Sequence, residues 1–218
     1  GHVTARAAAE TGLAEGTPVI AGTIDAAAEA VSVGVLNSGD LMLMYGSTIF
    51  IILITPERVR DGRLWYAPWL FPGQHGAMAG LSTSGTLTHW FRENFARELP
   101  PETAVIALTK EAEASPPGAK GLVLLPYFSG ERTPIHDTKA KGILFGLDLT
   151  HTRADMFRAV LEGIAHGTRH VFDTYAEAGQ APRAIYAVGG GTKNRVWSEA
   201  TSDISGMTQV LRQKTIGA

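Results

Sequence analysis

The sequence predicts an α/β fold, in which short apolar strands alternate with amphipathic helices. Apolar runs such as Ile49–Ile54 are bounded by glycines and small hydroxyl-bearing residues, as buried strands are. Between about residues 154 and 178, apolar side chains instead recur at three- and four-residue steps, the period of a helix that packs along one face. Segments of these two kinds follow one another along the chain, which favours an α/β architecture.

The composition is that of an ordinary folded domain. Of the 218 residues, 44% are hydrophobic and 18% are charged, and the formal net charge is -2. So small a charge predicts no general attraction to nucleic acid or to an anionic membrane. The chain has no cysteine, which excludes disulfides and thiol catalysis and favours the cytoplasm. The apolar run Ile49–Ile54 is too short to span a bilayer.

The first predicted strand, Thr17–Gly22, is expected to be buried and to end in a glycine turn. Asp25 follows it directly, at the head of an alanine-rich helix over about 26–33. An aspartate in this place can cap the helix. It can also lie exposed at the carboxyl end of a strand, where ligands collect in α/β folds, and serve as a general base.

A hairpin is predicted next. A turn over 37–40 leads into the strand-like runs Leu41–Tyr45 and Ile49–Ile54, which flank a tip made of Gly46, Ser47 and Thr48. Backbone amides and hydroxyls at such a tip can surround a phosphate. An ordinary hairpin turn explains the same residues.

The middle of the chain predicts mostly surface structure. Residues 56–80 are expected to form a long loop with short strands, 84–97 a helix, and 100–120 a helix followed by a loop. The segment from Gly80 to Gly85 narrowly misses the nucleophile elbow Gly-x-Ser-x-Gly of serine hydrolases, because Ser84 replaces the last glycine. A serine hydrolase is therefore disfavoured.

A short strand between Gly142 and Gly146 is expected to be buried, and a long helix follows it over about 154–178. Thr152 and Asp155 form a capping pair at the start of this helix, and a glycine and a proline shortly after it end it. Two histidines lie one helical turn apart and could share a metal ion. No third ligand is indicated, so a solvated polar face is the preferred interpretation. The residues of this face are Glu162, His166, Arg169, His170 and Asp173.

The last predicted unit is a strand over Ala184–Val188, a turn of three glycines and a helix from about Asn194 to Ser205. Glycines between a strand and a helix let backbone amides approach an anionic ligand closely. A tight turn without a ligand explains them equally well. Trp197 is expected to be a packing residue.

Taken together and in order, these motifs resemble those of the FGGY family of carbohydrate kinases, and the resemblance is nearest to its xylulokinase-like members. Each motif is weak alone, but their order along the chain is specific. The motifs are Thr11–Val19, Gly22–Ala27, Gly46–Thr48, Ser82–Gly85 with Trp90, Leu125–Pro134, Lys141–Gly163 and Gly189–Asn194.

The resemblance implies an actin-like, ribonuclease-H-like ATPase fold of two α/β domains with ATP between them. Residues 1–31 would be the tail of the first domain and the hinge with the catalytic aspartate, and residues 32–218 the C-terminal nucleotide-binding domain. The chain begins without methionine, and Ile216–Ala218 should lead into another element, so we expect a piece of a longer protein. The metal loop and most sugar contacts would then lie in a preceding domain.

The resemblance also implies roles for individual residues. Asp25 would be the catalytic base, although Thr23 and Ile24 stand where the family often has glycines. The hairpin tip would hold the phosphates of ATP, which binds with Mg²⁺, and the chain itself would supply no metal ligand. The phosphate-binding residues would be Gly46, Ser47 and Thr48, and those at the adenosine end Gly85, His89, Gly189, Gly190, Gly191 and Asn194.

The implied activity is ATP-dependent phosphorylation of a small sugar or polyol, with D-xylulose as the first expectation. Alternatives are L-ribulose, glycerol or gluconate, or a non-catalytic actin-like nucleotide-binding module. The 218 residues alone are expected to be inactive. The apolar strands could also support a homodimer.

Overall fold

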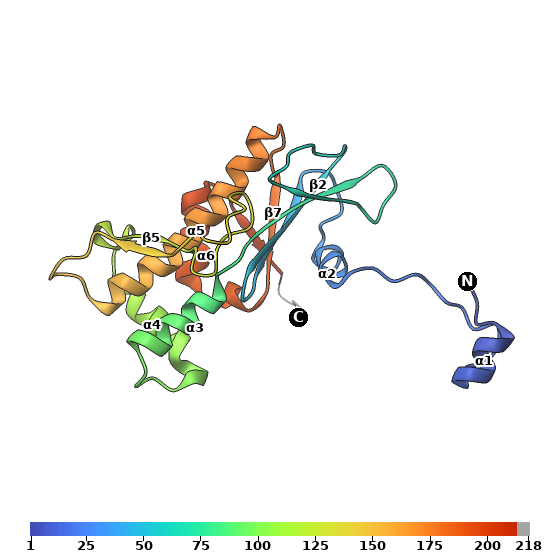
Figure 1. Cartoon of the computed structure of the whole chain (residues 1–218), viewed down its shortest axis with the longest axis horizontal. Helices are drawn as coiled ribbons and strands as arrows, with labels where there is room; N and C mark the ends of the chain where they lie inside the picture. The colour runs from blue at the N-terminus through green and yellow to red at the C-terminus, as the bar shows by residue number, and fades with distance from the viewer. Residues whose placement is uncertain (213–218) are drawn as a thin grey trace.

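The computed structural model describes residues 1–212, and within them a six-stranded mixed sheet carries the fold (Figure 1). The strand order is β3-β4-β2-β1-β7-β8. The strands are β1 (Asp40–Tyr45), β2 (Ile49–Thr55), β3 (Trp65–Pro68), β4 (His75–Leu81), β7 (Ala184–Val188) and β8 (Gln209–Leu211). The helices are α1 (Ala5–Thr11), α2 (Asp25–Val33), α3 (Gly85–Phe95), α4 (Pro101–Glu113), α5 (Arg153–Glu177) and α6 (Arg195–Ser205). A separate two-stranded sheet joins β5 (Val123–Leu125) to β6 (Ile143–Phe145).

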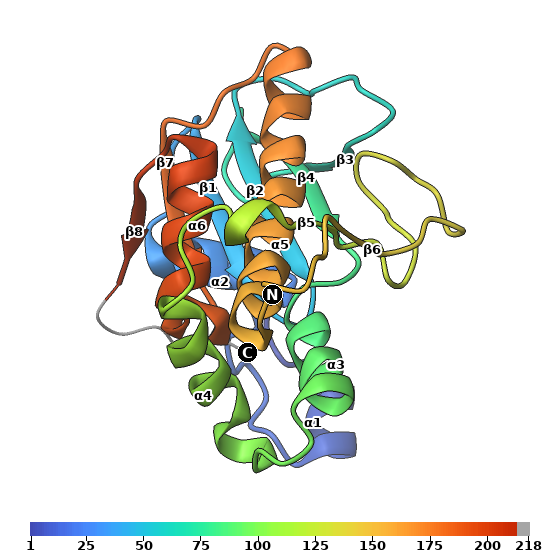
Figure 2. The ribbon, with the colours of Figure 1, turned by 90° about the vertical axis from the view of Figure 1, so that its left-hand side faces the viewer.

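Helices cover both faces of the large sheet, because its central strands are apolar on both sides. Leu41 and Leu43 belong to the core shared with α5 and α6, whereas Met42, between them, belongs to the core shared with α2. This alternation follows from the two-residue period of a strand. Figure 2 shows α5 and α6 in front of the sheet and α2 behind it.

The predicted hairpin is confirmed. Strands β1 and β2 are antiparallel, and Tyr45 lies opposite Ile49. Strand β1 is also paired in parallel with β7, with Met44 opposite Val188. The hairpin tip and the glycine turn after β7 therefore leave the same edge of the sheet, which positions the site described below.

The long helix α5 is confirmed together with its start, where Thr152 and Asp155 form a capping box. Gly163 lies where β5 crosses the helix, and a Cβ there would come within 2.6 Å of the Leu124 carbonyl oxygen. The predicted polar face is only partly right. The two histidines are exposed, but Glu162 is buried and ion-paired with Arg158 at 2.7 Å.

Two predicted buried strands are not as expected. Of the segment 17–22, only Pro18 forms a bridge, to His2, and Ile20 is 88% exposed, because among the described residues it has no strand beside it to pack against. The strand β6 forms, but Phe145 is 71% exposed. Its sheet has only two strands and packs on α5 by one face, so alternate apolar residues point outward.

Other predictions concern the middle and the ends of the chain. Strand β4, of seven residues, is longer than the short strands expected within 56–80.

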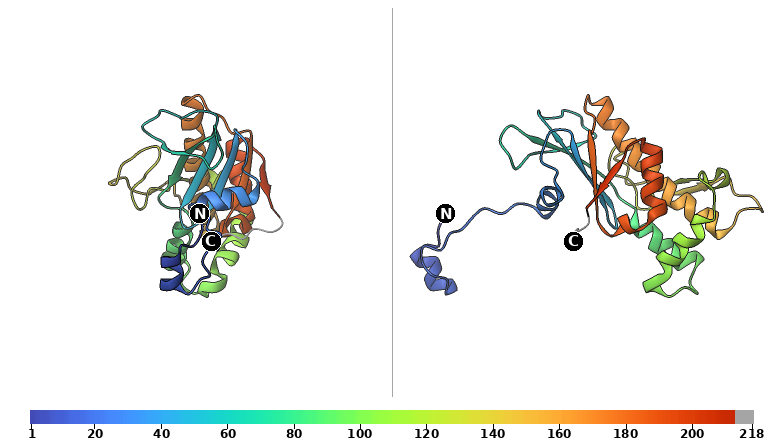
Figure 3. Two further views of the ribbon diagram at one scale, coloured as in Figure 1. Left: turned by 90° about the vertical axis from the view of Figure 1, so that its right-hand side faces the viewer. Right: turned by 180° about the vertical axis from the view of Figure 1, so that it is seen from behind.

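Helix α1 lies apart from the sheet at the end of an extended segment (Figures 1 and 3). The predicted domain boundary after residue 31 falls within α2 and stays a prediction. The prediction for Ile216–Ala218 lies outside the described residues. Within residues 1–212, no helix is long and apolar enough to cross a membrane.

Candidate functional site

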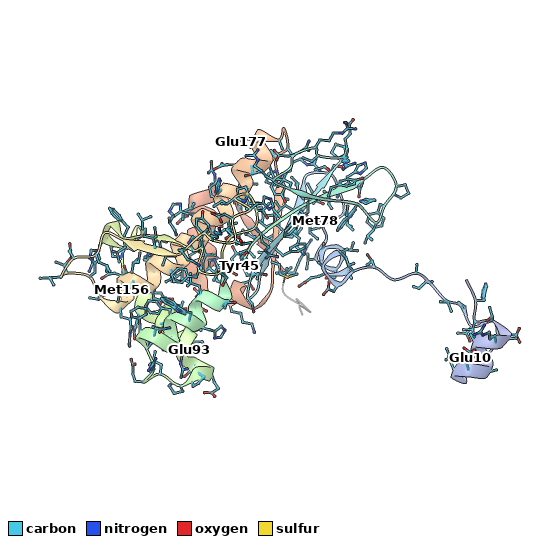
Figure 4. All side chains as sticks on the ribbon, in the orientation of Figure 1. Glu10, Tyr45, Met78, Glu93, Met156 and Glu177 are labelled. Carbon is cyan, nitrogen blue, oxygen red and sulfur yellow. The ribbon has the colours of Figure 1, made fainter. Side chains whose placement is uncertain are left out.

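A cavity of about 690 Å³ opens where β1 and β7 end, between α3, α4 and the start of α6. Figure 4 places Tyr45, the last residue of β1, where the sheet meets these helices. The cavity is lined by Tyr45, Gly46, Ser47, Gly85, Thr88, His89, Pro101, Glu102, Val105, Ile106, Thr109, Lys110, Glu113, Gly190, Gly191, Lys193, Asn194, Arg195 and Trp197.

The hairpin tip presents open hydrogen-bond donors. Among residues 1–212, the amides and hydroxyls of Ser47 and Thr48 donate no hydrogen bond. The carbonyl oxygens of Gly46 and Ser47 are occupied instead. They accept hydrogen bonds from the segment 84–86 over 2.9–3.1 Å. The tip is thus fixed through its carbonyls, while its donors stay available to an anion.

Gly85 has a packing role that the sequence did not reveal. Its amide donates to the Gly46 carbonyl oxygen at 3.0 Å, and a Cβ on Gly85 would lie 2.5 Å from that oxygen. The first amides of α3 are used in this junction with the hairpin. The start of α3 therefore orients the hairpin tip instead of binding an anion itself. His89, one turn further, is exposed and lines the cavity.

The three glycines after β7 have three different surroundings. Gly189 has φ +90°, and a Cβ there would come within 2.5 Å of the Tyr45 carbonyl oxygen. Gly191 packs against Trp197, where a Cβ would lie 2.6 Å from the ring. A Cβ on Gly190 would meet nothing within 4 Å, although this residue lines the cavity. Two of the glycines are therefore required for packing, and Gly190 alone leaves open space.

Asn194 caps α6 and joins it to α4. Its Oδ1 accepts a hydrogen bond from the Trp197 amide at 3.1 Å, and its Nδ2 donates to Thr109 Oγ1 at 2.8 Å. The residue is 8% exposed. The ring of Trp197 meets Tyr45 edge to face at 4.9 Å, which confirms the predicted packing role of this tryptophan. Burial raises the pKa of Tyr45, so its hydroxyl stays neutral and donates to Gln209.

Helix α4 forms a wall of the cavity that sequence reasoning did not predict. Val105, Ile106 and Thr109 line it, and Lys110 lies on the same side. Ile106 is 72% exposed, which is unusual for an isoleucine in a helix. The apolar run Ala104–Leu108 was the available signal, because five consecutive apolar residues of a helix cannot all face the same side.

The structure does not bring Asp25 into the cavity. It is the first residue of α2, its side chain is exposed, and its Oδ1 accepts a hydrogen bond from the Ala26 amide at 2.7 Å. One turn further lies Glu29, whose pKa is raised by burial and by the negative charge of Asp25. Thr48 and Gly189 also do not line the cavity, although each adjoins a residue that does.

Comparison with known proteins identifies the family. The sequence model for the FGGY family of carbohydrate kinases, C-terminal domain, matches residues 41–218. This chain belongs to the FGGY family of carbohydrate kinases. The resemblance drawn from the sequence motifs is therefore confirmed, and so is the actin-like, ribonuclease-H-like fold that it implied.

Relatives of this FGGY domain include sugar kinases with different names. It is 34% identical to the xylulose kinase of Bacillus subtilis over 94% of this chain and 40% of that protein. It is 32% identical to the ribulokinase of Geobacillus thermodenitrificans over 94% of this chain and 38% of that one. The crystal structure of xylulose kinase from Rhodospirillum rubrum superposes with a TM-score of 0.89 and 37% identity, covering 97% of this chain and 42% of that one. The chain thus spans about 40% of the length of these relatives.

Proposed function

We propose that this FGGY domain binds ATP in the cavity and acts in the phosphorylation of a sugar or polyol hydroxyl. One observation carries the proposal. The cavity unites the hairpin tip, the start of α3 and the glycine turn, which lie far apart in the sequence and were each predicted to contact the nucleotide. Its volume lies within the range of small-molecule sites, roughly 300–1,000 Å³.

The surroundings of the cavity fit the parts of a nucleotide. The open amides and hydroxyls of Ser47 and Thr48 would hold phosphate oxygens. The apolar side chains of Val105 and Ile106 would pack against the base, and Gly190 would leave room beside it. ATP, when bound, supplies the phosphoryl group. Among residues 1–212 there is no cluster of three or more acidic or histidine side chains suited to a metal, so Mg²⁺ would accompany the phosphates of ATP.

Asp25 would act as the general base. It would accept the proton of the sugar hydroxyl that attacks the phosphoryl group, as carboxylates do in phosphoryl transfer. Its exposure at the start of α2 leaves the carboxylate free to meet a substrate held by another domain. An ATP-dependent sugar kinase is expected in the cytoplasm, as the cysteine-free sequence also predicts.

The preferred substrate is D-xylulose. The xylulose kinases of Bacillus subtilis and Rhodospirillum rubrum support this substrate by their names. The ribulokinase is almost as similar, at 32% identity against 34% for the Bacillus subtilis protein. A nucleotide-binding domain is not expected to distinguish these sugars. L-ribulose, gluconate and glycerol are therefore the alternative substrates.

The test is a coupled assay of ADP release in a complete two-domain FGGY kinase that carries this domain. We expect release that depends on the sugar, with D-xylulose giving the highest kcat/KM among ketoses and polyols. A different preferred sugar would correct the substrate alone. ATP binding without any sugar-dependent release would instead identify a non-catalytic nucleotide-binding module.

Replacement of Gly190 by leucine tests where the nucleotide binds. The side chain would enter open space at the cavity, so the fold should be retained while ATP affinity of the 218-residue chain falls about tenfold, equivalent to about 1.4 kcal/mol. Calorimetric titration with ATP measures this. Gly62→Leu is the matched control, because Gly62 also has open space around it but does not line the cavity. Unchanged affinity in Gly190→Leu would place the nucleotide elsewhere.

A further inference from the structure

Three consecutive side chains after β5 hold three consecutive backbone residues at the end of β4. Thr133 Oγ1 accepts a hydrogen bond from the Gly80 amide at 2.8 Å and donates to the Gly80 carbonyl oxygen at 3.0 Å. Arg132 Nη2 donates to the Leu81 carbonyl oxygen at 3.0 Å, and Glu131 Oε1 accepts from the Ser82 amide at 2.7 Å. Strand β3 pairs with β4 only as far as Met78. Beyond that point, these three side chains supply hydrogen-bond partners for the backbone of β4 and of Ser82.

The loop that carries these side chains is itself fixed. Glu131 and Asp137 exchange two backbone hydrogen bonds, of 2.8 and 3.0 Å, and Glu131 Oε1 also accepts from the Arg132 amide at 2.7 Å. The glutamate is 3% exposed. Burial raises its pKa, although hydrogen bonds from the Arg132 and Ser82 amides act in the opposite direction. A buried acidic residue of this kind is costly to the fold, which calls for a specific role.

The segment that Glu131 holds leads directly to the hairpin tip. Ser84, two residues after Ser82, donates through its amide to the Ser47 carbonyl oxygen and through its hydroxyl to the Gly46 carbonyl oxygen. Gly85 adds another hydrogen bond to the Gly46 carbonyl oxygen. A displacement at Ser82 would therefore be transmitted to the tip, whereas no hydrogen bond among residues 1–212 joins the segment 82–86 to α4.

We propose that Glu131 is a positioning residue, which holds the end of β4 so that the start of α3 keeps the hairpin tip in its phosphate-binding orientation. This inference rests on the proposed function, because it assigns the tip to the phosphates of ATP. It goes beyond that function in giving the Glu131–Thr133 segment a part in it. The role concerns the phosphate end of the nucleotide. Val105, Ile106 and Gly190, which we propose lie beside the base, make no hydrogen bond to residues 82–86 among the described residues, so adenosine affinity should change little.

The test compares the affinities of the 218-residue chain for ATP and for adenosine by calorimetric titration. Glu131→Ala is expected to weaken ATP about tenfold and to change adenosine less than about twofold. Glu131→Gln keeps the Oε1 acceptor and should restore most of the ATP affinity. Thr133→Val, which removes the hydrogen bonds to Gly80 while keeping the shape, should act in the same direction as Glu131→Ala and serves if that variant does not fold.

Asp40→Ala is the matched control. Asp40 is also a buried carboxylate whose Oδ2 accepts two backbone amides, those of Leu36 and Asn37, but it lies at the opposite end of β1 from the tip. The Asp40→Ala variant should lower the melting temperature and leave the ratio of the ATP and adenosine affinities unchanged. An unchanged ratio in Glu131→Ala and Thr133→Val would overturn the positioning role alone. Failure of the unsubstituted chain to bind either ligand would overturn the proposed function together with it.

Discussion

Replacing Asp25 by alanine is expected to lower turnover by about 10²–10⁴-fold in a complete two-domain kinase, while ATP binding is retained. The range is that of a general base removed from a reaction whose remaining catalysis comes from positioning and charge stabilisation. Asp25 lies outside the cavity, so the nucleotide should bind as before. The measurement is ADP release with D-xylulose at saturating ATP, together with an ATP titration of the same variant.

Glu29→Gln provides the matched control for this prediction. Glu29 lies one helical turn after Asp25 on α2 and is the nearest acidic neighbour in sequence. Since it has no part in the proposed chemistry, its variant should keep turnover within about twofold, well under the effect of a lost general base. Full turnover in Asp25→Ala would end the assignment of the base, and an equal loss in both variants would point to the charge of the α2 terminus instead.

The electrostatic effect of Asp25 on Glu29 can be tested without an activity assay. Burial and the negative charge of Asp25 both raise the pKa of Glu29. In Asp25→Ala, the pKa of Glu29 should therefore fall toward its ordinary value but remain elevated, because its burial is unchanged. Carboxyl-carbon NMR of the 218-residue chain over pH measures this. No change would mean that the charge of Asp25 does not act on Glu29.

The features that the sequence predicted well are those set by local patterns. The hairpin around Gly46 follows from two apolar runs and a small turn, and α5 follows from its period and the Thr152–Asp155 capping box. Most of the residues predicted for the nucleotide do meet in one cavity. They do so because the motifs fall at strand ends, and parallel pairing of β1 with β7 brings those ends together.

The features that the sequence did not predict depend on contacts between distant segments. Gly85, Gly189 and Gly190 look alike in the sequence, but only the folded chain shows which ones have backbone oxygens pressed against them. Likewise, the motif around Glu131 gives no sign that its side chains bind the end of β4. The exposure of Phe145 was missed for the same reason. The sequence of a strand does not reveal how many strands its sheet contains, and this sheet has only two.

Asp155→Ala is expected to lower the free energy of unfolding of the 218-residue chain by roughly 3 kcal/mol at neutral pH, as for loss of a buried charged acceptor. Asp155 is 1% exposed and is the acceptor for donors from three parts of the chain. The Ser115 hydroxyl donates to it at 2.7 Å, the Thr152 amide at 2.8 Å and Lys120 Nζ at 3.0 Å. Without it, the buried hydroxyl of Ser115 would lose its partner, and the capping box at the start of α5 would be broken.

The effect should depend on pH in a defined direction. Burial alone would raise the pKa of Asp155, but the hydrogen bonds from Ser115, Thr152 and Lys120 outweigh it and hold the pKa well below its ordinary value. A lowered folded-state pKa means that the carboxylate stabilises the fold fully above the unfolded-state pKa, about 4, and that this contribution is lost as the pH falls below it. Urea unfolding at pH 7 and pH 3 should therefore show a smaller difference between the unsubstituted chain and Asp155→Ala at the lower pH.

Asp148→Ala is the control that separates the buried network from an exposed one. Asp148 also accepts hydrogen bonds from a threonine amide and hydroxyl, those of Thr150, but its side chain is 62% exposed. Water can replace those bonds, so its loss should cost far less than that of Asp155. Equal losses in the two variants, or a loss in Asp155→Ala that does not shrink toward pH 3, would show that the charge of Asp155 does not hold the start of α5 in place.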